Sequence, residues 1–271
     1  MTDQEFAQLS ALVQTQTGIA LGPHKRIHLA SRLARRLRAV GVRSFADYYD
    51  LLAARDPEGR EMVQFVNAVT TNKTDFFREA HHFAFLTDTW APAARGRAAV
   101  PRVRAWSAGC STGEEAYTLA WTLRDALGPG ADLRVLGSDI DTEVLAQAQT
   151  AIYAREDVAP VPAAHLPRYF LRGTGANVDR VRVRPELRAL VTFRRINLLD
   201  DTWPIRTDFD VIMCRNVLIY FDRPTQQQVL TRLATALAPA GLLCLGHSEN
   251  VYGLVHELEH VGTTMYRRKE D

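Results

Sequence analysis

Apolar residues recur at helical spacing through residues 1–70. The first segment, FAQLSALVQTQTGI, places its large apolar side chains every three or four residues, at Phe6, Leu9, Leu12 and Val13. This is the period of an α-helix with one buried face. Gly18 and the Gly22-Pro23 pair then predict the end of that helix.

Three further helices are predicted before residue 70, with boundaries set by capping and helix-ending residues. HKRIHLASRLARRLRAVG is stopped by Gly41, SFADYYDLLAA begins with Ser44 as its N-cap, and GREMVQFVNAVTTN gives the last helix. Because no strand pattern occurs in this stretch, residues 1–70 are predicted to form an all-helical domain. Residues 71–99 are predicted to link it to the rest of the chain.

From about residue 100, short apolar strands alternate with helices. The elements are, in order, VRAWSAG and EEAYTLAWTLRDALG, LRVLGSDID and TEVLAQAQTAIY, LVTFRRINLL, FDVIMCRNVLIYF and PTQQQVLTRLATALAPAG, and LLCLGHSEN. This alternation predicts an α/β domain over residues 100–271, with a mostly parallel, doubly wound, Rossmann-like sheet. The final TTMYRR is typical of a last strand, either at the edge of the sheet or beside its end.

One segment interrupts this alternation. Residues 155–188 contain three prolines and then YFLR and RVRVR on either side of a turn rich in Gly and Asn. Two short apolar-polar runs around such a turn predict a small antiparallel hairpin. We therefore expect a β-subdomain inserted into the α/β domain.

Composition adds constraints on location but few on function. The 271 residues carry a net charge of +2, so a basic partner surface would have to be local. The three cysteines have no metal-like spacing, which favours a reducing compartment. The N-terminus MTDQEFAQL lacks the apolar region of a signal peptide, and no apolar run reaches the roughly 20 residues of a membrane helix. These features predict a soluble, cytoplasmic protein without membrane insertion, and no oligomer signal argues against a monomer.

The stretch WSAGCSTGEEAY, residues 106–117, places Gly109 and Gly113 in a strand–turn–helix connection. Nucleotides bind at such connections in many α/β folds, although a tight turn without a ligand gives the same pattern. The next predicted strand ends at Asp139, where a carboxylate can accept hydrogen bonds from both ribose hydroxyls. Asp141 is better placed to cap the following helix. Together these residues favour an adenosine-containing ligand.

Two glutamates at the start of the following helix narrow the choice of ligand. A dinucleotide needs its pyrophosphate against the helix N-terminus, where Glu114 and Glu115 would repel it. S-adenosylmethionine (SAM) has no phosphate, and its amino group and sulfonium are cationic. We expect Glu114, which is nearer the turn, to face the ligand. A nicotinamide-dependent oxidoreductase stays as an alternative, disfavoured by these acids and by the missing third glycine.

Seven sequence blocks, in the right order along nearly the whole chain, resemble the chemotaxis receptor methyltransferase (CheR) family. They are NKTDFFREAHHF, WSAGCSTGEEAY, SDIDTEVLAQA, YFLRGTG, INLLD, CRNVLIYFD and GHSEN. The resemblance implies a helical domain, a linker and a SAM-binding domain with a β-subdomain. It also implies a SAM-dependent protein-glutamate O-methyltransferase that acts on the cytoplasmic helical bundle of methyl-accepting chemotaxis receptors and releases S-adenosylhomocysteine.

The resemblance also assigns site residues. Those implied to contact the cofactor are Asn72, Thr74, Arg78, Ala108, Glu114, Asp139, Asn197, Leu198, Arg215 and Asn216. Tyr220 would lie close to the transferred methyl group and, with Arg78, forms the expected catalytic pair. Arg78 could orient the attacking carboxylate or bind the methionine carboxylate of the cofactor. A catalytically inactive SAM-binding signalling or adaptor domain is the non-enzymatic alternative, against which Arg78, Asp139 and Tyr220 argue.

The expected reaction is an in-line displacement in which a receptor glutamate attacks the sulfonium methyl. It needs no general base, because an unperturbed glutamate, with a pKa of about 4.3, is already ionised. Since the opposite charges neutralise each other in the transition state, an apolar pocket that aligns the reactants helps. Phe76, Phe77 and Tyr220 are predicted to form its wall.

A basic stripe on the second predicted helix is a candidate receptor-docking surface. Its residues are Lys25, Arg32, Arg35 and Arg36. A solvated helix face is the simpler interpretation, and nucleic acid is disfavoured because no aromatic platform or known motif accompanies the stripe. The family resemblance further suggests that a receptor C-terminal peptide binds at the β-subdomain as an added edge strand.

Adjacent histidines at 81 and 82 suggest a metal site at first sight. Neighbouring helical residues point in different directions, so no metal is predicted.

Overall fold

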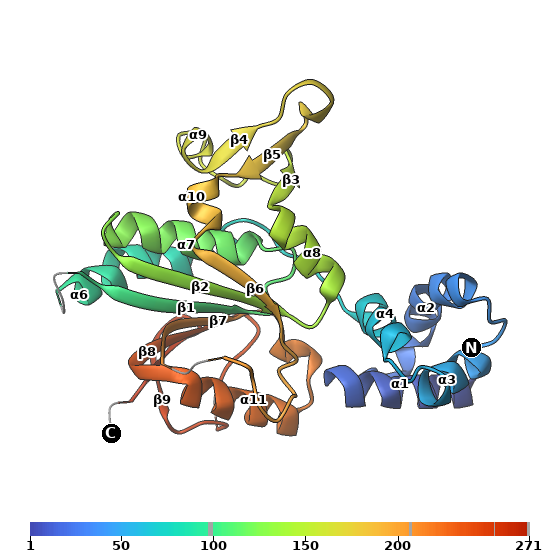
Figure 1. The fold of residues 1–271 in the computed structure, drawn as a ribbon. Helices are drawn as coiled ribbons and strands as arrows, with labels where there is room; N and C mark the ends of the chain where they lie inside the picture. The colour runs from blue at the N-terminus through green and yellow to red at the C-terminus, as the bar shows by residue number, and fades with distance from the viewer. Residues whose placement is uncertain (97–99, 206–207, 252, 270–271) are drawn as a thin grey trace.

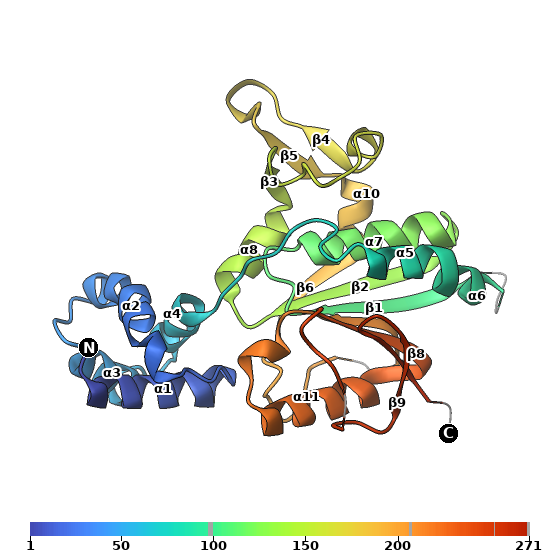
Figure 2. The same ribbon diagram turned by 180° about the vertical axis from the view of Figure 1, so that it is seen from behind.

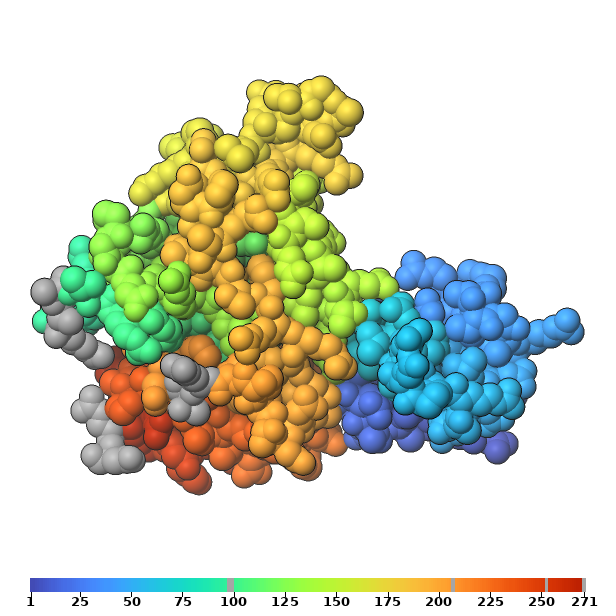
Figure 3. Space-filling view, viewed as in Figure 1, coloured from blue at the N-terminus to red at the C-terminus, as the bar shows by residue number. Residues whose placement is uncertain are grey.

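The computed structural model describes residues 1–96, 100–205, 208–251 and 253–269. Within these residues, a group of N-terminal helices lies beside a seven-stranded sheet that carries helices on both faces (Figure 1). A three-stranded sheet stands off one side of the larger one, as the space-filling view also shows (Figure 3). Residues 97–99, the end of the predicted linker, lie outside the described residues. No helix in the described ranges is both long and apolar enough to cross a membrane.

The N-terminal helices form where the apolar period predicted them. They are α1 (Asp3–Thr17), α2 (Arg26–Val40), α3 (Phe45–Ala54) and α4 (Arg60–Val69), with a 3₁₀ turn, η1 (Pro23–Lys25), before α2. Gly18 and Gly41 end α1 and α2 in the left-handed conformation, which glycine adopts without a Cβ clash. The Ser44 side chain accepts the backbone N–H of Asp47 and caps α3. The predicted helix boundaries at these residues are confirmed.

A buried polar network supplements the apolar packing of these helices. The Tyr48 hydroxyl donates to Glu61 at 2.7 Å, and Arg36 donates to both carboxylate oxygens of Glu61, at 3.0 and 2.6 Å. Burial, followed by the bond to Glu61, raises the pKa of Tyr48. Around the network lies the apolar core of α1 to α4, which includes Leu9, Val13, Leu33, Phe65 and Val66. Arg36 therefore holds α2 to α4 from within the domain.

Between α4 and the large sheet, the predicted linker contains helices that the sequence pattern did not show. They are α5 (His81–Phe85), a π-helical turn η2 (Leu86–Trp90) and α6 (Ala91–Arg95). Figure 2 shows the chain running from α4 across the sheet's end to α5, which lies alongside α7 (Glu114–Leu127). Phe77, Phe83 and Trp121 pack edge to face there.

The large sheet has the order β6-β2-β1-β7-β8-β10-β9. Its strands are β1 (Arg102–Ala108), β2 (Asp132–Asp139), β6 (Val191–Arg195), β7 (Phe209–Cys214), β8 (Leu237–Leu245), β9 (Leu258–Gly262) and β10 (Met265–Arg268). The pairs from β6 to β8 are parallel, and β10 is antiparallel to both β8 and β9. The mostly parallel sheet is confirmed. The prediction of TTMYRR as the last strand is confirmed, because it contains β10, which lies beside the end strand of the sheet rather than at the edge itself. The edge is formed by β9, whose pattern was not recognised.

Helices cover both faces of this sheet. On one face lie α7 and α8 (Thr142–Thr150), and on the other lies α11 (Arg223–Ala236), preceded by a 3₁₀ turn, η4 (Leu218–Tyr220) (Figure 1). Side chains of β1 point to opposite faces of the sheet and enter two apolar cores. Val103 and Ala105 pack in the core on the α7 side, and Trp106 packs in the core on the α11 side. The carboxyl ends of β1, β2 and β7 are left uncovered by these layers.

The inserted subdomain contains three strands rather than two. They are β3 (Ile152–Ala154), β4 (Phe170–Arg172) and β5 (Arg180–Val183), paired antiparallel in the order β3-β5-β4. Short helical turns accompany them: α9 (Leu166–Tyr169), η3 (Gly175–Asn177) and α10 (Pro185–Arg188). The predicted hairpin is confirmed, but β3 precedes residue 155, because its three residues looked like the end of the α8 helix.

We predict that Arg36→Ala lowers the free energy of unfolding by about 2 kcal/mol, because it leaves the partly buried Glu61 carboxylate without its cation. The matched change at the exposed Arg35 should stay within about 0.5 kcal/mol of the parent. Urea unfolding followed by circular dichroism measures both. Equal stability of the two variants would contradict the structural role of Arg36.

Candidate functional site

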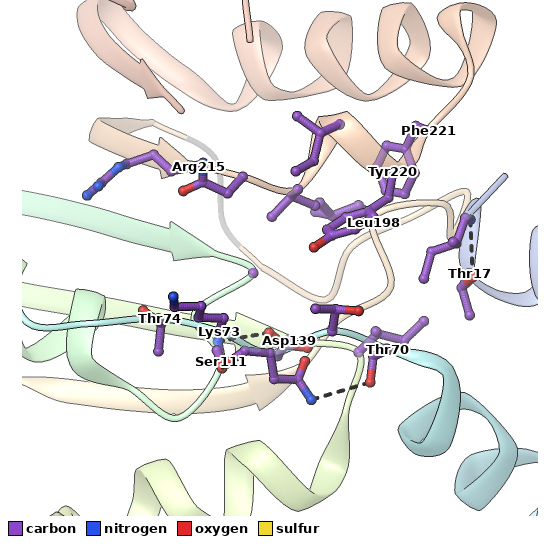
Figure 4. A pocket seen from close by; sticks show the side chains of 18 of the residues that line it. Thr17, Thr70, Lys73, Thr74, Ser111, Asp139, Leu198, Arg215, Tyr220 and Phe221 are labelled. Carbon is purple, nitrogen blue, oxygen red and sulfur yellow. Dashed lines mark hydrogen bonds between the residues drawn. The ribbon is translucent and has the colours of Figure 1, made fainter. Parts of the chain in front are cut away.

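A cavity of about 310 Å³ opens where β1, β2 and β7 end. Its walls come from six parts of the chain: the end of α1, the segment that follows α4, the turns after β1 and β2, and the segments after β6 and β7 (Figure 4). In the close-up, Asp139 and Ser111 face Leu198 and Tyr220 across the cavity, with Arg215 toward one end and Thr17 toward the other. The sheet thus gathers side chains that are far apart in the sequence.

The turn between β1 and α7 requires glycine at two positions. Gly109 has φ 81°, and a Cβ there would lie 2.4 Å from a methyl carbon of Val217. Gly113 has φ 99°, and a Cβ there would lie 2.9 Å from the Cβ of Ala148. The backbone N–H groups of Gly109 and Cys110 both donate to the Ser138 carbonyl at 2.8 Å. The turn therefore packs closely against β2, against α8 and against the segment that follows β7, and its backbone lies along the cavity wall.

Asp139 ends β2 and lines the cavity. Its Oδ2 accepts the backbone N–H of Ser111 at 2.8 Å, and its Oδ1 accepts that of Asp141 at 3.0 Å. Burial raises the pKa of this carboxyl, while the two backbone donors oppose the rise. Because each carboxylate oxygen still has a lone pair, Asp139 can accept further hydrogen bonds from a diol.

Asp141 joins three elements. Its Oδ1 accepts the N–H groups of Glu143 and Val144 at 2.8 and 3.3 Å, and so caps α8 as predicted. Its Oδ2 accepts the Thr70 hydroxyl at 2.8 Å and Asn72 Nδ2 at 2.7 Å. Asn72 is thereby held at the cavity wall with its amide bound to protein.

Of the two glutamates that begin α7, Glu115 lines the cavity and Glu114 does not. Glu114 bonds the Thr112 hydroxyl at 2.6 Å. Glu115 accepts the Ser107 hydroxyl at 2.6 Å. Successive helical side chains point about 100° apart, and nearness to the turn did not decide which one faces inward. Glu115 joins the residues that line the cavity, and the expected contact of Glu114 with the ligand stays a prediction.

Arg215 follows β7 and lies in a buried charge cluster at one end of the cavity. Its side chain is 1% exposed, 3.4 Å from Glu115 and 3.8 Å from Glu79, and it donates to the Arg78 carbonyl. Burial raises the pKa of Glu115, and Arg215 counteracts that rise. Asn216 beside it also lines the cavity, at φ 60°, with its N–H bound to Glu249 at 2.8 Å. Neither Glu79 nor Glu115 was singled out as Arg215's partner from the sequence.

Arg78 and Thr74 line the cavity from the segment after α4. Arg78 Nη1 donates to the Lys73 carbonyl at 2.9 Å, which folds this segment back on itself. The two phenylalanines between them do not reach the cavity. Phe76 packs on Tyr153 and Phe170, and Phe77 on Phe83 and Trp121. The predicted aromatic wall of Phe76 and Phe77 is wrong, because both rings belong to the apolar core.

The opposite wall contains Asn197, Leu198 and Tyr220. The Asn197 side chain donates to the Gln16 carbonyl at 2.9 Å and accepts the Leu199 N–H at 3.1 Å, so it joins this wall to the end of α1. The Ala20 N–H donates to the Tyr220 carbonyl at 2.9 Å.

At the edges of the cavity, the lining differs from the predicted site at three residues. Ala108, the last residue of β1, is fully buried and does not line the cavity. Thr17 and Ile19 do line it, and Ile19 forms a β-bridge with Phe221. No sequence signal marked these two residues, because their role depends on how the helical domain meets the sheet.

The predicted docking stripe is partly used inside the protein. Arg32 donates to the Val69 carbonyl at 2.7 Å, to the Thr71 hydroxyl at 2.8 Å and to the Thr70 carbonyl. Arg36 is bound to Glu61. Both residues therefore have structural partners within the helical region, and their part in docking stays a prediction. Lys25 and Arg35 are exposed, as is the neighbouring Arg38.

The reason for excluding a metal at His81 and His82 is also wrong. Their ring centroids are only 4.0 Å apart, with planes tilted by 44°. His81 is the first residue of the short helix α5, where the backbone brings the two rings together.

Comparison with known proteins covers nearly the whole chain. The model of the CheR methyltransferase all-alpha domain matches residues 4–70, and that of the CheR methyltransferase SAM-binding domain matches residues 72–267. A chemotaxis protein methyltransferase of Klebsiella aerogenes is 46% identical over 267 residues, covering 98% of this chain and 90% of the relative. That of Escherichia coli K12 is 45% identical over 273 residues, covering 100% and 93%. Chemotaxis protein methyltransferase 2 of Pseudomonas aeruginosa is 46% identical over 266 residues, covering 98% and 93%.

Proposed function

The chain belongs to the CheR methyltransferase family, and from that premise we propose that its cavity binds SAM and that the methyl group passes to glutamate carboxylates of chemotaxis receptors. Membership makes the chain a SAM-dependent chemotaxis protein methyltransferase. The assignment of the cavity is carried by one observation: the carboxylates of the buried Asp139 and the partly buried Glu115 both line it, beside the glycine turn and the start of α7.

The donors and acceptors of the cavity fit the parts of SAM. Asp139 can accept hydrogen bonds from the two ribose hydroxyls. The apolar side chains of Ile140, Ile196 and Leu198 offer a surface for the adenine ring. Glu115 suits a cationic amino group, and the same carboxylate would repel a pyrophosphate at the start of α7. The same charge arrangement disfavours a nicotinamide dinucleotide.

Two arginines at the cavity could each bind a carboxylate group of a ligand. Arg78 and Arg215 both line the cavity. Arg215 is already flanked by Glu79 and Glu115, whereas the guanidinium of Arg78 bonds only a backbone carbonyl among the described residues. We therefore assign to Arg78 the binding of a carboxylate, from the cofactor or from the receptor, and to Arg215 the positioning of Glu115.

When bound, the cofactor supplies an electrophilic methyl group. The chain's own residues have three tasks: to orient the cofactor, to orient the incoming carboxylate and to keep water from the reacting atoms. Tyr220, in the wall opposite Asp139, is assigned to the last two (Figure 4). No residue needs to remove a proton, because a receptor glutamate is already ionised near neutral pH.

For receptor docking we propose the exposed basic face of α2. Arg35 and Arg38 are exposed on α2, Lys25 is exposed at the end of η1 just before it, and Ile27 is 81% exposed. A receptor bundle that carries rows of glutamates complements these charges. At the β-subdomain, β3 and β4 each pair with β5 on one side only among the described residues, so a receptor C-terminal peptide could add a strand. We further propose that the protein works as a cytoplasmic monomer.

We predict that Arg78→Ala lowers kcat/KM for methyl transfer about 100-fold, the effect of losing one charge-assisted contact of roughly 3 kcal/mol. A raised KM for SAM would assign Arg78 to the cofactor carboxylate, and a lowered kcat would assign it to the receptor carboxylate. Radiolabelled methyl transfer to receptor membranes measures both. Arg78→Lys, which keeps the charge, should recover part of the activity, and near-parental turnover by Arg78→Ala would refute the assignment.

We predict that affinity for S-adenosylhomocysteine falls as the pH is lowered, beginning above the pH at which a free aspartate titrates. The ionised Asp139 is the stronger acceptor, and burial raises its pKa, so binding is complete above that pKa and is lost as the pH falls through it. Asp139→Asn should weaken binding about tenfold at neutral pH and flatten the pH dependence. Calorimetric titration across the acidic range tests this, with Glu115→Gln separating the contribution of the second acid. An unchanged pH profile in Asp139→Asn would exclude Asp139 as the titrating group.

We predict that the charge reversals Arg35→Glu and Arg38→Glu together slow receptor methylation about tenfold at low salt and reduce its salt dependence. The matched control is Arg95→Glu, an exposed charge on α6 away from this face. Initial rates with receptor membranes at several ionic strengths compare the variants. Identical rates for the double variant and the control would remove α2 as the docking surface.

A further inference from the structure

Next to the cavity, three side chains of metal-binding type converge at the start of α5. Glu79, His81 and His82 each bring one ligand atom to within 4.8 Å of the other two. Glu79 adopts φ 54°, an uncommon conformation for a residue other than glycine. This backbone turn sets the carboxylate against the two imidazoles.

The contacts of Thr264 bear on which ring nitrogen of His82 carries the proton. When Thr264 Oγ1 donates its hydrogen to the Thr263 carbonyl, 2.8 Å away, it accepts from His82 Nε2, 2.9 Å away. In the neutral ring, His82 Nδ1 then carries a lone pair, as a metal ligand requires.

That lone pair faces another acceptor. His82 Nδ1 lies 3.9 Å from Glu79 Oε2. Both atoms are buried, and neither has a hydrogen-bond partner among the residues that the structure describes. Two electron-rich atoms placed together in this way are stabilised by a cation between them.

We propose that Glu79, His81 and His82 form a binding site for a divalent transition-metal ion. One carboxylate and two imidazoles are a donor set that Zn²⁺ and Co²⁺ accept. His247, whose Nδ1 lies 3.2 Å from Glu79 Oε1 and whose side chain is 69% exposed, marks the solvent side of the same carboxylate.

The His82 ring is preorganised for metal binding. It is fully buried and is held in place by its bond to Thr264, which limits the entropy lost on binding.

Arg215 would compete with a bound metal ion, and this competition would couple the metal site to the cavity. Its Nε lies 3.8 Å from Glu79 Oε2, so an ion would compete with Arg215 for this carboxylate. Arg215 would keep Glu115, at 3.4 Å, as its remaining counter-ion. Because Arg215 and Glu115 line the cavity, metal binding and cofactor binding should weaken each other. This coupling rests on the proposed cofactor site, whereas the metal site itself does not.

A cobalt titration of the tag-free full-length chain tests the site directly. We expect one Co²⁺ to bind at micromolar concentration, with a visible absorption spectrum that reports nitrogen and oxygen ligands. His81→Ala should weaken binding at least tenfold. His256→Ala, which removes an exposed histidine elsewhere, should not. Equal Co²⁺ affinity in His81→Ala and the parent, or no saturable binding by the parent, would overturn the proposal.

A second titration tests the coupling without any methyl transfer. Zn²⁺ at a saturating concentration should weaken S-adenosylhomocysteine binding several-fold in the parent and leave it unchanged in His81→Ala. If the parent binds S-adenosylhomocysteine equally with and without Zn²⁺, the coupling is wrong. If S-adenosylhomocysteine does not bind even without metal, the proposed cofactor site fails, and the cobalt result still decides the metal site.

Discussion

The buried carboxylate of Asp141 is the interaction on which the arrangement of the site depends. One of its oxygens caps α8, and the other holds Thr70 and Asn72. A helix cap alone is worth about 1 kcal/mol, but here the same group also fixes the path of the chain that leaves the helical domain. The position of Arg78 and of the charge cluster beyond it follows from that path. If Asp141 were replaced by an apolar residue, the Thr70 and Asn72 donors would lose a shared acceptor in a place that water reaches poorly.

Two kinds of constraint shape the cavity wall. At the β1–α7 turn the constraint is space, since Val217 and Ala148 leave no room for a side chain at Gly109 and Gly113. At its charged end the constraint is electrostatic, since Arg215 is buried and needs the acids around it. Space determines where a ligand can approach the backbone, and charge determines which ligand is accepted.

Much of this was predictable from local sequence signals. The apolar period and the capping residues predicted α1 to α4. Gly18, Gly41 and Ser44 each begin or end the helix next to them in the sequence, so a local pattern was enough. The βαβ alternation and the acid at the end of β2 indicated where the cavity lies, because in a parallel sheet the carboxyl ends of strands share one edge. Other features depend on tertiary packing. The presence of Glu115 in the cavity lining and the internal hydrogen bonds of Arg32 depend on neighbours that no local pattern encodes.

Short elements were the other source of error, for a related reason. The three residues of β3 continue the apolar period of α8, and only pairing with β5 makes them a strand. The five-residue α5 has too few turns to show a period. Its geometry, which places His81 against His82, could not be predicted from the rule for long helices.

Thr17 and Ile19 belong to the helical region, yet they line a cavity whose other walls belong to the sheet. The cavity is therefore complete only while the bridge between Ile19 and Phe221 and the bonds around it hold the two regions together. A ligand that binds only the complete cavity stabilises the junction between the two regions and stabilises neither region by itself. Occupancy should therefore favour the unfolding of the helical region and the sheet in one cooperative step.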